Sequence, residues 1–415
     1  MSPLSALARR ATLRRLARLE RGRLLVREAG EVLSVGDPSA EPVTIRVHDA
    51  RFHESIALGG AVGAGEAYAA GWWSSDDLTG VVRLMLRNRE ALDGLEGGAA
   101  SLTGTLRRLL HVLHANSRRG ARRNIRAHYD LGNAFFAQFL DETLTYSCAL
   151  FERPDASLAE ASVAKYDRIA RLLDLRPSDH LLEIGSGWGS FAIHAASRYG
   201  CRVTTTTISP AQLSLARQRV HESGLDDRIT LLGLDYRDLR GSYDKLASIE
   251  MIEAIGHEKY ETFYRQCARL LVPKGRAVIQ AITIPDDRYE AARREVDFIK
   301  RYVFPGSNIP SPSVLAAAAS AADLTPVRAD EIGLHYAETL RRWRENLLAH
   351  RGPIAALGYD DRFFRLWEFY LCYCEGGFLE RAIGAAQLVY ARGAAGAVVG
   401  CPVEAVPPAP AERAA

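Results

Sequence analysis

From about residue 180 onward, short apolar runs rich in β-branched residues alternate with segments whose apolar residues have helical spacing. The predicted strands are 180–184, 202–208, 229–234, 245–251 and 275–284. The predicted helices between them are 190–199, 210–223 and 260–271. This order predicts an α/β fold whose parallel sheet has helices on both faces and binds its ligand at the carboxyl ends of the strands.

The N-terminal region has the pattern of a smaller α+β domain. Residues 42–48 alternate between apolar and polar like a strand, and residues 78–89 have helical spacing. The turns between elements are expected at Gly59, Gly60, Gly63 and Gly65.

Composition indicates where the domains meet. A stretch rich in Gly, Ala and Ser at 94–105 predicts a linker, and the Pro- and Ala-rich residues 396–415 predict a disordered tail. We therefore expect an N-terminal domain with its linker at 1–120, which docks on lipid or membrane, and a larger domain at 121–395.

The formal net charge of +3 is too small to indicate nucleic-acid binding, but the basic residues are unevenly distributed. Arginines crowd the first 27 residues and recur in the segment 106–126, which is predicted to be helical. The first cluster is interleaved with Leu4, Leu13, Leu16, Leu19 and Leu24. This pattern is typical of a basic amphipathic helix on an anionic membrane surface, and it equally fits a solvated helix.

No apolar run approaches the roughly 20 residues that are needed to cross a bilayer. The N-terminus also lacks the apolar core and cleavage site of a signal peptide, so we expect a cytoplasmic protein that associates peripherally with the inner face of the membrane. The six cysteines form no paired C-x-x-C pattern, and the lone C-x-C of Cys372 and Cys374 is a weak metal signal. Free thiols and no metal site are expected.

The segment Glu183-Ile-Gly-Ser-Gly-Trp-Gly189 follows a predicted strand and opens a predicted helix. A glycine-rich turn alone also fits a dinucleotide enzyme. Here the spacing is G-x-G-x-G with an acidic residue two positions ahead, and the second strand ends without the carboxylate that a dinucleotide fold uses to bind ribose. The pattern favours S-adenosylmethionine over a nicotinamide cofactor. Asp235 is placed to receive the adenine amino group and Tyr236 to cover the base, although Tyr236 also fits a packing role.

Short motifs follow one another at 124–133, 145–149, 183–189, 207–209, 235–239, 250–256, 300–306 and 333–336. In this order they resemble the cyclopropane-fatty-acyl-phospholipid synthases, a family that includes the mycolic acid cyclopropane synthases. The resemblance is close over residues 120–393 and looser before them. It implies a class I methyltransferase with a Rossmann-like, seven-stranded, mostly parallel sheet, and it implies a homodimer.

The resemblance also implies roles for particular residues. The cofactor-binding positions are Tyr146, Ser147, Glu183, Gly185, Ser186, Gly187, Gly189, Thr207, Ile208, Gln212, Tyr236 and Arg237, to which the residue pattern adds Asp235. The family holds a bicarbonate ion beside the reacting methyl group, and the matching positions are Cys148, Glu253, Ile282 and Tyr336. Cys374 matches a further active-site cysteine. Many members have a histidine where this chain has Gln280, whose amide can hydrogen-bond an oxyanion but cannot carry a proton charge.

The reaction expected from this resemblance transfers a methylene unit from S-adenosylmethionine to the cis double bond of an unsaturated phospholipid acyl chain. The product is a cyclopropane fatty acid, formed through a carbocation that bound bicarbonate deprotonates. A fatty acyl C-methyltransferase that gives a methylene- or methyl-branched chain is an alternative that the sequence leaves open. A non-catalytic lipid-binding protein is a more remote alternative, because the cofactor loop and Glu253 are intact.

Overall fold

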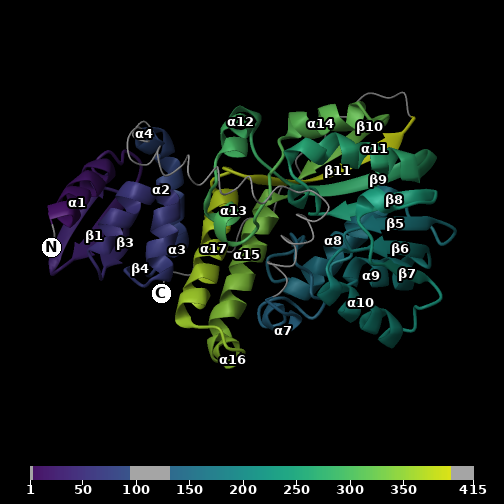
Figure 1. Ribbon diagram of the computed structural model, residues 1–415, viewed down its shortest axis with the longest axis horizontal. Coiled ribbons are helices and arrows are strands. Elements are labelled where there is room, and N and C mark those ends of the chain that lie inside the picture. Colours follow the sequence, from purple (N-terminus) through teal and green to yellow (C-terminus); the bar gives the residue numbers. More distant parts are fainter. Residues whose placement is uncertain (1–2, 94–130, 394–415) are drawn as a thin grey trace. The chain divides into compact units, whose positions relative to one another are not determined.

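The computed structural model describes residues 3–93 and 131–393, which divide into two compact units (Figure 1). Among the described residues, the C-terminal unit comprises 131–293, 306–339 and 383–393. The N-terminal unit comprises 3–93, 294–305 and 340–382. The predicted linker at 94–105, the basic segment 106–126 and the tail at 396–415 lie outside the described residues.

The C-terminal unit is built on a seven-stranded sheet with the order β10-β11-β9-β8-β5-β6-β7. Its strands are β5 (His180–Ile184), β6 (Arg202–Thr206), β7 (Ile229–Leu232), β8 (Tyr243–Ile249), β9 (Leu271–Thr283), β10 (Leu324–Glu331) and β11 (Gly384–Arg392). Strands β5 to β9 pair in parallel, whereas β11 runs antiparallel to both β9 and β10. The predicted mostly parallel, seven-stranded α/β sheet is confirmed.

Helices cover both faces of this sheet and give it two separate cores. The elements of this unit outside the sheet are α7 (Asn133–Phe136), α8 (Leu158–Leu173), α9 (Ser190–Tyr199), α10 (Pro210–Glu222), η1 (Tyr236–Asp238), η2 (Ile252–Ala254), η3 (His257–Lys259), α11 (Tyr260–Leu270), α12 (Asp286–Arg294, whose last residue falls in the other unit) and α14 (Pro312–Ser320). Leu182 of β5 packs in one core with Tyr264 of α11, and Leu181 packs in the other with Phe191 of α9. Alternate residues of β5 thus serve opposite faces, as a buried strand requires.

The predicted elements match the observed ones closely in this unit. The strand at 180–184 and the helix at 190–199 have the predicted bounds. Pro210 begins α10, where its fixed backbone suits the first helical turn and Ser209 caps the helix. The largest difference is at β9, which begins at Leu271 rather than at 275.

The N-terminal unit has a four-stranded sheet with the order β2-β1-β3-β4. Its strands are β1 (Arg23–Glu28), β2 (Glu31–Gly36), β3 (Pro42–Val47) and β4 (Trp73–Ser75). Its helices are α1 (Pro3–Leu16), α2 (Arg51–Ala69), α3 (Leu78–Arg87), α4 (Arg89–Asp93), α13 (Phe298–Tyr302), α16 (Arg351–Ala356) and α17 (Asp361–Leu379). Helix α15 (Gly333–Ala349) begins in the C-terminal unit and belongs to the N-terminal unit from Leu340.

Buried polar bonds tie α17 to the helices that precede it in the N-terminal unit. Tyr68 of α2 donates its hydroxyl to Glu368 at 2.9 Å, and Thr79 of α3 donates to Glu375 at 3.1 Å. Residues far apart in sequence therefore form one core here.

The glycines at 59–65 were expected to mark turns, and this prediction is wrong. All of them lie within α2, which is kinked at Gly60 (φ 55°, ψ −136°). A Cβ atom on Gly63 would lie 1.9 Å from the backbone oxygen of Ser55, and one on Gly65 would lie 2.5 Å from the Phe298 ring. Close packing explains Gly63 and Gly65, and the left-handed φ angle explains Gly60.

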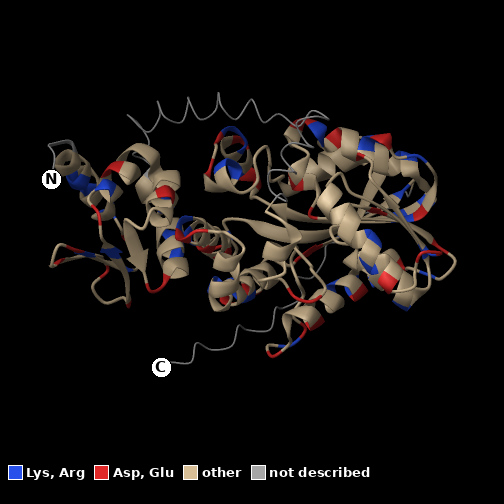
Figure 2. Cartoon of the chain, turned by 60° about the horizontal axis from the view of Figure 1, so that its bottom comes forward, with Lys and Arg blue, Asp and Glu red and all other residues tan. Residues whose placement is uncertain are grey.

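The basic N-terminal segment forms a shorter helix than its leucine pattern suggested. Helix α1 ends at Leu16, and Leu24 lies buried in strand β1 instead of extending a helical face. The buried residues of α1 are Ser5, Ala8 and Thr12, while Leu7 is 66% exposed. The arginines of α1 are coloured blue in the helix next to the N-terminus in Figure 2. Among the described residues, no helix has the length and apolar character to cross a bilayer.

Candidate active site

The loop after β5 is shaped by glycines with left-handed backbone conformations. Gly185, Gly187 and Gly189 have φ angles of 101°, 49° and 88°, a region that other residues adopt only with strain. The amides of Gly185 and Ser186 donate to the Thr206 carbonyl at 3.0 and 2.9 Å, which ties the loop to the end of β6. The loop thereby brings the N-terminus of α9 to the carboxyl edge of the sheet.

Glu183 and the segment after β6 hold this edge rigid. The Glu183 carboxylate accepts a hydrogen bond from the Thr205 hydroxyl at 2.5 Å, and burial raises the pKa of Glu183 to about 7. Beyond β6, the Thr207 hydroxyl donates to Gln212 at 2.9 Å, and both side chains are buried. Ile208 lies between them and is partly exposed, so its side chain is accessible to a ligand.

Asp235, Tyr236 and Arg237 follow β7 at the same edge. Arg237 donates to both carboxylate oxygens of Asp235, at 2.8 and 2.7 Å, so the acidic group is already paired with a cation. The Tyr236 ring packs edge-on against Phe263, with 5.6 Å between ring centroids, and its buried hydroxyl has no partner among the described residues. The structure thus shows the packing role of Tyr236, and its contact with an adenine base stays a prediction.

Lys165 of α8 is a buried cation that the sequence analysis missed. Its ammonium donates to the Ser147 hydroxyl at 2.7 Å, and burial lowers its pKa to about 8, although the charge of Glu250 opposes this shift. The signal was present, because Lys165 stands four residues from both Ala161 and Ile169 on the buried stripe of α8. The neighbouring Tyr146 packs against Phe136 with 5.2 Å between ring centroids.

Glu250 is the second residue that was missed, and its carboxylate is the point where the site converges. One oxygen accepts hydrogen bonds from the backbone amide of Cys148 and from Nε2 of Gln280, both at 2.8 Å. The other oxygen accepts from the Tyr336 hydroxyl at 2.6 Å. Desolvation raises the pKa of Glu250, while these hydrogen bonds lower it. Glu250 opens the motif 250–256, in which only Glu253 was given a role.

Glu253 lies on η2, one turn beyond Glu250. Its Oε1 accepts from the Ile282 amide at 2.5 Å, and its buried Oε2 has no partner among the described residues. Burial, followed by the nearby charge of Glu250, raises the pKa of Glu253 to about 8. The carboxyl group is therefore mainly protonated at neutral pH and can donate a hydrogen bond from Oε2.

Gln280 is fully buried, and both ends of its side chain are engaged. Its Nε2 donates to Glu250, and its Oε1 accepts from Gln387 of β11 at 2.9 Å. Gln387 in turn accepts from Arg168, which pairs with Asp330 at 2.7 Å. Gln280 was expected to hydrogen-bond an oxyanion, and the anion that it contacts here is the Glu250 carboxylate.

The cysteines assigned to the site differ in their surroundings. The Cys148 thiol is buried and donates to the Ala149 carbonyl at 3.2 Å, and burial raises its pKa well above the usual range. Its backbone amide, rather than its sulfur, contacts Glu250. Cys374 lies on α17 and belongs to the N-terminal unit, whereas the other assigned residues belong to the C-terminal unit. Burial raises the pKa of Cys374 too. Within the described residues, no group of three or more His, Cys, Asp and Glu side chains is arranged to hold a metal ion.

The two expected small molecules, S-adenosylmethionine and bicarbonate, differ in how well they fit this site. The glycine loop has room for a cofactor, since a Cβ atom on Gly187 would meet nothing within 4 Å. In contrast, the donors assigned to bicarbonate already have protein partners, although the buried Oε2 of Glu253 has none among the described residues. Cys148 and Tyr336 contact the Glu250 carboxylate, and the Ile282 amide contacts Glu253. A bicarbonate ion does not fit among these donors in the observed arrangement.

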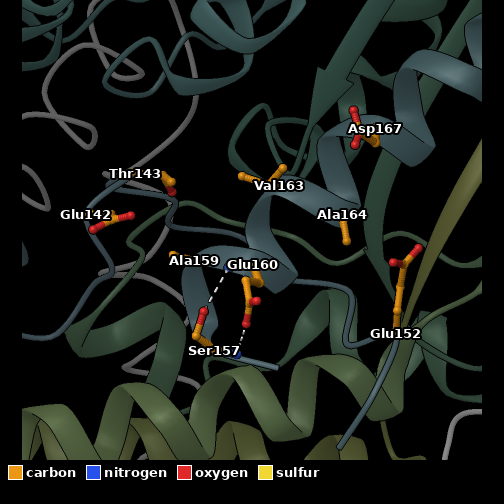
Figure 3. A pocket seen from close by; sticks show the side chains of 9 residues that line it. All are labelled: Glu142, Thr143, Glu152, Ser157, Ala159, Glu160, Val163, Ala164 and Asp167. Atoms are coloured by element: carbon orange, nitrogen blue, oxygen red, sulfur yellow. Dashed lines mark hydrogen bonds between the residues drawn. The ribbon is translucent and has the colours of Figure 1, made fainter. Parts of the chain in front are cut away.

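A surface pocket lies at α8 and the loops before it (Figure 3). Its lining includes the carboxylates of Glu142, Glu152, Glu160 and Asp167. Glu160 accepts from the Ser157 amide in the capping box that begins α8, as the dashed lines in Figure 3 show. None of the assigned site residues lines this pocket, so it is distinct from the candidate active site.

The parallel sheet, the glycine loop after β5 and the hydrogen-bonded carboxylates after β8 define an S-adenosylmethionine-dependent class I methyltransferase. Residues 116–388 match the family described as mycolic acid cyclopropane synthetase. The chain belongs to this family.

Known relatives match over most of the chain. The tuberculostearic acid methyltransferase of Mycobacterium tuberculosis is 39% identical over 85% of this chain and 84% of its own length. The cyclopropane-fatty-acyl-phospholipid synthase of Escherichia coli is 34% identical over 88% of this chain and 93% of its own length. The crystal structure of mycolic acid cyclopropane synthase CmaA1 complexed with SAH and CTAB is 33% identical, with a TM-score of 0.62, and covers 65% of this chain and 98% of that one.

The glycine loop gives a first test of the cofactor site. We expect Gly185→Ala to weaken S-adenosylhomocysteine binding about ten-fold or more, because alanine at this φ angle costs ~1–3 kcal/mol and displaces the loop. Isothermal titration calorimetry measures this affinity. Gly224→Ala is the matched control, since Gly224 also has a positive φ of 64° but lies beyond the C-terminus of α10. Equal losses of affinity in both variants would contradict the assignment.

Proposed function

We propose that this enzyme transfers a one-carbon unit from S-adenosylmethionine to the cis double bond of an unsaturated phospholipid acyl chain and closes a cyclopropane ring. The observation that carries the proposal is the pairing of a glycine-rich cofactor loop with hydrogen-bonded carboxylates at the same edge of the sheet. The near full-length similarity to the E. coli cyclopropane-fatty-acyl-phospholipid synthase supports the choice of substrate.

The chemistry explains why such a site is required. Bound S-adenosylmethionine supplies an electrophilic methyl group, and the protein must hold a weakly nucleophilic alkene in line with it. Attack leaves a carbocation on the acyl chain, which water would convert to an alcohol, so the site must exclude water. Aromatic rings such as Tyr146 and Phe136, in edge contact near the loop, can tolerate a cation without attacking it. A base must then remove a proton from the intermediate.

A fatty acyl C-methyltransferase is the second candidate. The 39% identity to the tuberculostearic acid methyltransferase supports it. Both reactions share the first step and differ in which proton leaves. Loss of a proton from the added methyl group closes the ring, whereas loss of a proton from the chain gives a methyl-branched alkene. A methylene branch forms when a hydride shift first moves the cation to the methyl-bearing carbon and the methyl group then loses a proton.

The products distinguish these reactions. The full-length enzyme is incubated with S-adenosylmethionine and liposomes of a mono-unsaturated phospholipid, and the acyl chains are then examined by mass spectrometry and by alkene-specific derivatisation. We expect a gain of one CH2 unit with loss of the double bond. A gain of CH2 with unsaturation retained would instead establish the C-methyltransferase, and bound but unchanged lipid would exclude both enzymes.

Glu253 is expected to impose the alkaline limit of activity. Its pKa of about 8 predicts that the donor proton on its carboxyl group is lost, and activity falls, as pH rises above this value. Glu253→Gln keeps an N–H donor but does not titrate, so this alkaline decline should disappear. Turnover should fall roughly five-fold, as expected for one altered hydrogen bond.

A pH profile of kcat together with S-adenosylhomocysteine titrations measures both effects. Affinity for the cofactor product should survive in Glu253→Gln, because this residue is not assigned to the cofactor loop. A drop in affinity as steep as the drop in turnover would contradict the assignment.

We also propose that the N-terminal unit docks on the anionic inner face of the membrane. Exposed arginines on α1, including Arg10 and Arg14, support this placement. Each basic residue near an anionic bilayer contributes ~1 kcal/mol to binding. A homodimer, which the family resemblance implies, stays a prediction.

Liposome sedimentation tests this docking. We expect the double variant Arg10→Gln, Arg14→Gln to bind anionic vesicles about thirty-fold more weakly than the wild type at low salt. The control is Arg202→Gln, Arg217→Gln, which removes the same charge from exposed positions in the C-terminal unit. Equal weakening in both double variants would show that net charge, rather than α1, determines binding.

A further inference from the structure

The family resemblance assigned Cys148 and Tyr336 to the surroundings of an external anion, and Gln280 stands where many members have a histidine. In this chain all three contact a side chain. The Cys148 amide, the Gln280 amide group and the Tyr336 hydroxyl all donate to the carboxylate of Glu250, at 2.6 to 2.8 Å. These donors come from a loop, from β9 and from α15, so the protein builds the cradle from separate elements. The anion that the cradle was expected to bind is therefore already supplied by the chain.

The hydrogen bonds leave a defined part of this carboxylate available. Oε1 accepts two hydrogen bonds and Oε2 accepts one, so an acceptor position remains on Oε2. The donors Cys148, Gln280 and Tyr336 are buried, whereas Glu250 is only partly buried. Glu250 therefore has some exposed surface, whereas its hydrogen-bond donors are buried.

The backbone at Glu250 carries a second, independent indication. Its φ angle is 50°, a left-handed conformation that is uncommon for a residue other than glycine. The Glu250 amide donates to the Gln280 carbonyl at 2.8 Å, which holds this conformation in place. Strain that the surroundings maintain is concentrated at functional sites, and here it directs the side chain into the cradle.

The surroundings of the two carboxyl groups also differ. Burial raises the pKa of both Glu250 and Glu253. Three hydrogen bonds and the buried Lys165 favour the charged form of Glu250, whereas Glu253 accepts one hydrogen bond, from the Ile282 amide. The two carboxyl groups thus have different environments, which is how a site separates a base from an acid.

We propose that Glu250 is the built-in general base of this enzyme and takes the place of bicarbonate. The proposal rests on the proposed function, because it concerns the proton that the lipid cation loses. A C–H bond of the added methyl group breaks, its electron pair forms the second ring C–C bond, and the proton moves to Oε2 of Glu250. The neutral carboxylic acid then returns this proton to water after the product leaves, so no other reactant is needed.

Gln280 acts as a positioning residue in this arrangement. Its amide nitrogen holds Oε1, while Gln387 fixes the amide from the other side. With both hydrogen bonds on Oε1, the oxygen that faces the proton is Oε2.

The test compares bicarbonate dependence in the wild type and in two variants at Glu250. Activity on unsaturated phospholipid liposomes is measured in CO2-free buffer and in the same buffer with added bicarbonate. Glu250→Gln fills the cradle but accepts no proton, and Glu250→Gly empties the cradle while suiting the positive φ angle. Glu222→Gln, at the exposed end of α10, is the matched control.

We expect equal wild-type activity with and without bicarbonate. Glu250→Gln should lose about 100-fold or more in kcat under both conditions, as expected for removal of a general base. Glu250→Gly should lose as much in CO2-free buffer and recover at least about ten-fold when bicarbonate refills the cradle. The Glu222→Gln variant should match the wild type.

The outcomes separate this inference from the function that it rests on. A wild type that is active only with bicarbonate, or a Glu250→Gln variant that retains full activity, would overturn the role of Glu250 and leave the proposed function standing. A wild type that leaves the lipid unchanged would overturn both. Thermal melting and S-adenosylhomocysteine binding verify that the variants are folded, and the wild-type comparison does not depend on them.

Discussion

A charged carboxylate close to the interior of a protein requires enough donors to replace water, and this requirement organises the site at the edge of the sheet. Glu250 meets it with hydrogen bonds from Cys148, Gln280 and Tyr336 and with the nearby charge of Lys165. Glu253 lacks such a set and is mainly neutral near pH 7. Within the motif 250–256, the surroundings of Glu250 favour a carboxylate that accepts hydrogen bonds, and those of Glu253 favour a carboxyl group that can donate one.

The parallel strands of the sheet end at one edge, and this arrangement brings the groups around Glu250 and Glu253 together. The cofactor loop follows β5, the carboxyl groups follow β8, and Gln280 lies near the end of β9. The pairing of Ile249 with Gln280 places the two strands in a register that brings Glu250 beside the glutamine. Strand order and register thus determine where the site residues lie, and their side chains determine the hydrogen bonds and charges of the site.

Much of this arrangement was predictable from the sequence, for physical reasons. The strand at 180–184, the helix beginning at Pro210 and the glycine loop have strong local signals, because periodicity and backbone freedom depend on neighbouring residues. The contacts of Glu250 and Lys165 depend on residues distant in sequence, and a positive φ at a glutamate has no local signal. The prediction of turns at the glycines of α2 was wrong for the same reason. The contacts of Gly63 with Ser55 and of Gly65 with Phe298 form only in the folded unit.

The hydrogen bond from Gln387 to Gln280 also bears on how the edge of the sheet is protected. Gln387 lies on β11, which is the last described element in chain order and pairs between β9 and β10. Until β11 is inserted, the edge of β9 is unpaired and presents backbone groups that promote association with other chains. The strand that holds Gln280 behind Glu250 is therefore also the strand that covers the edge of β9.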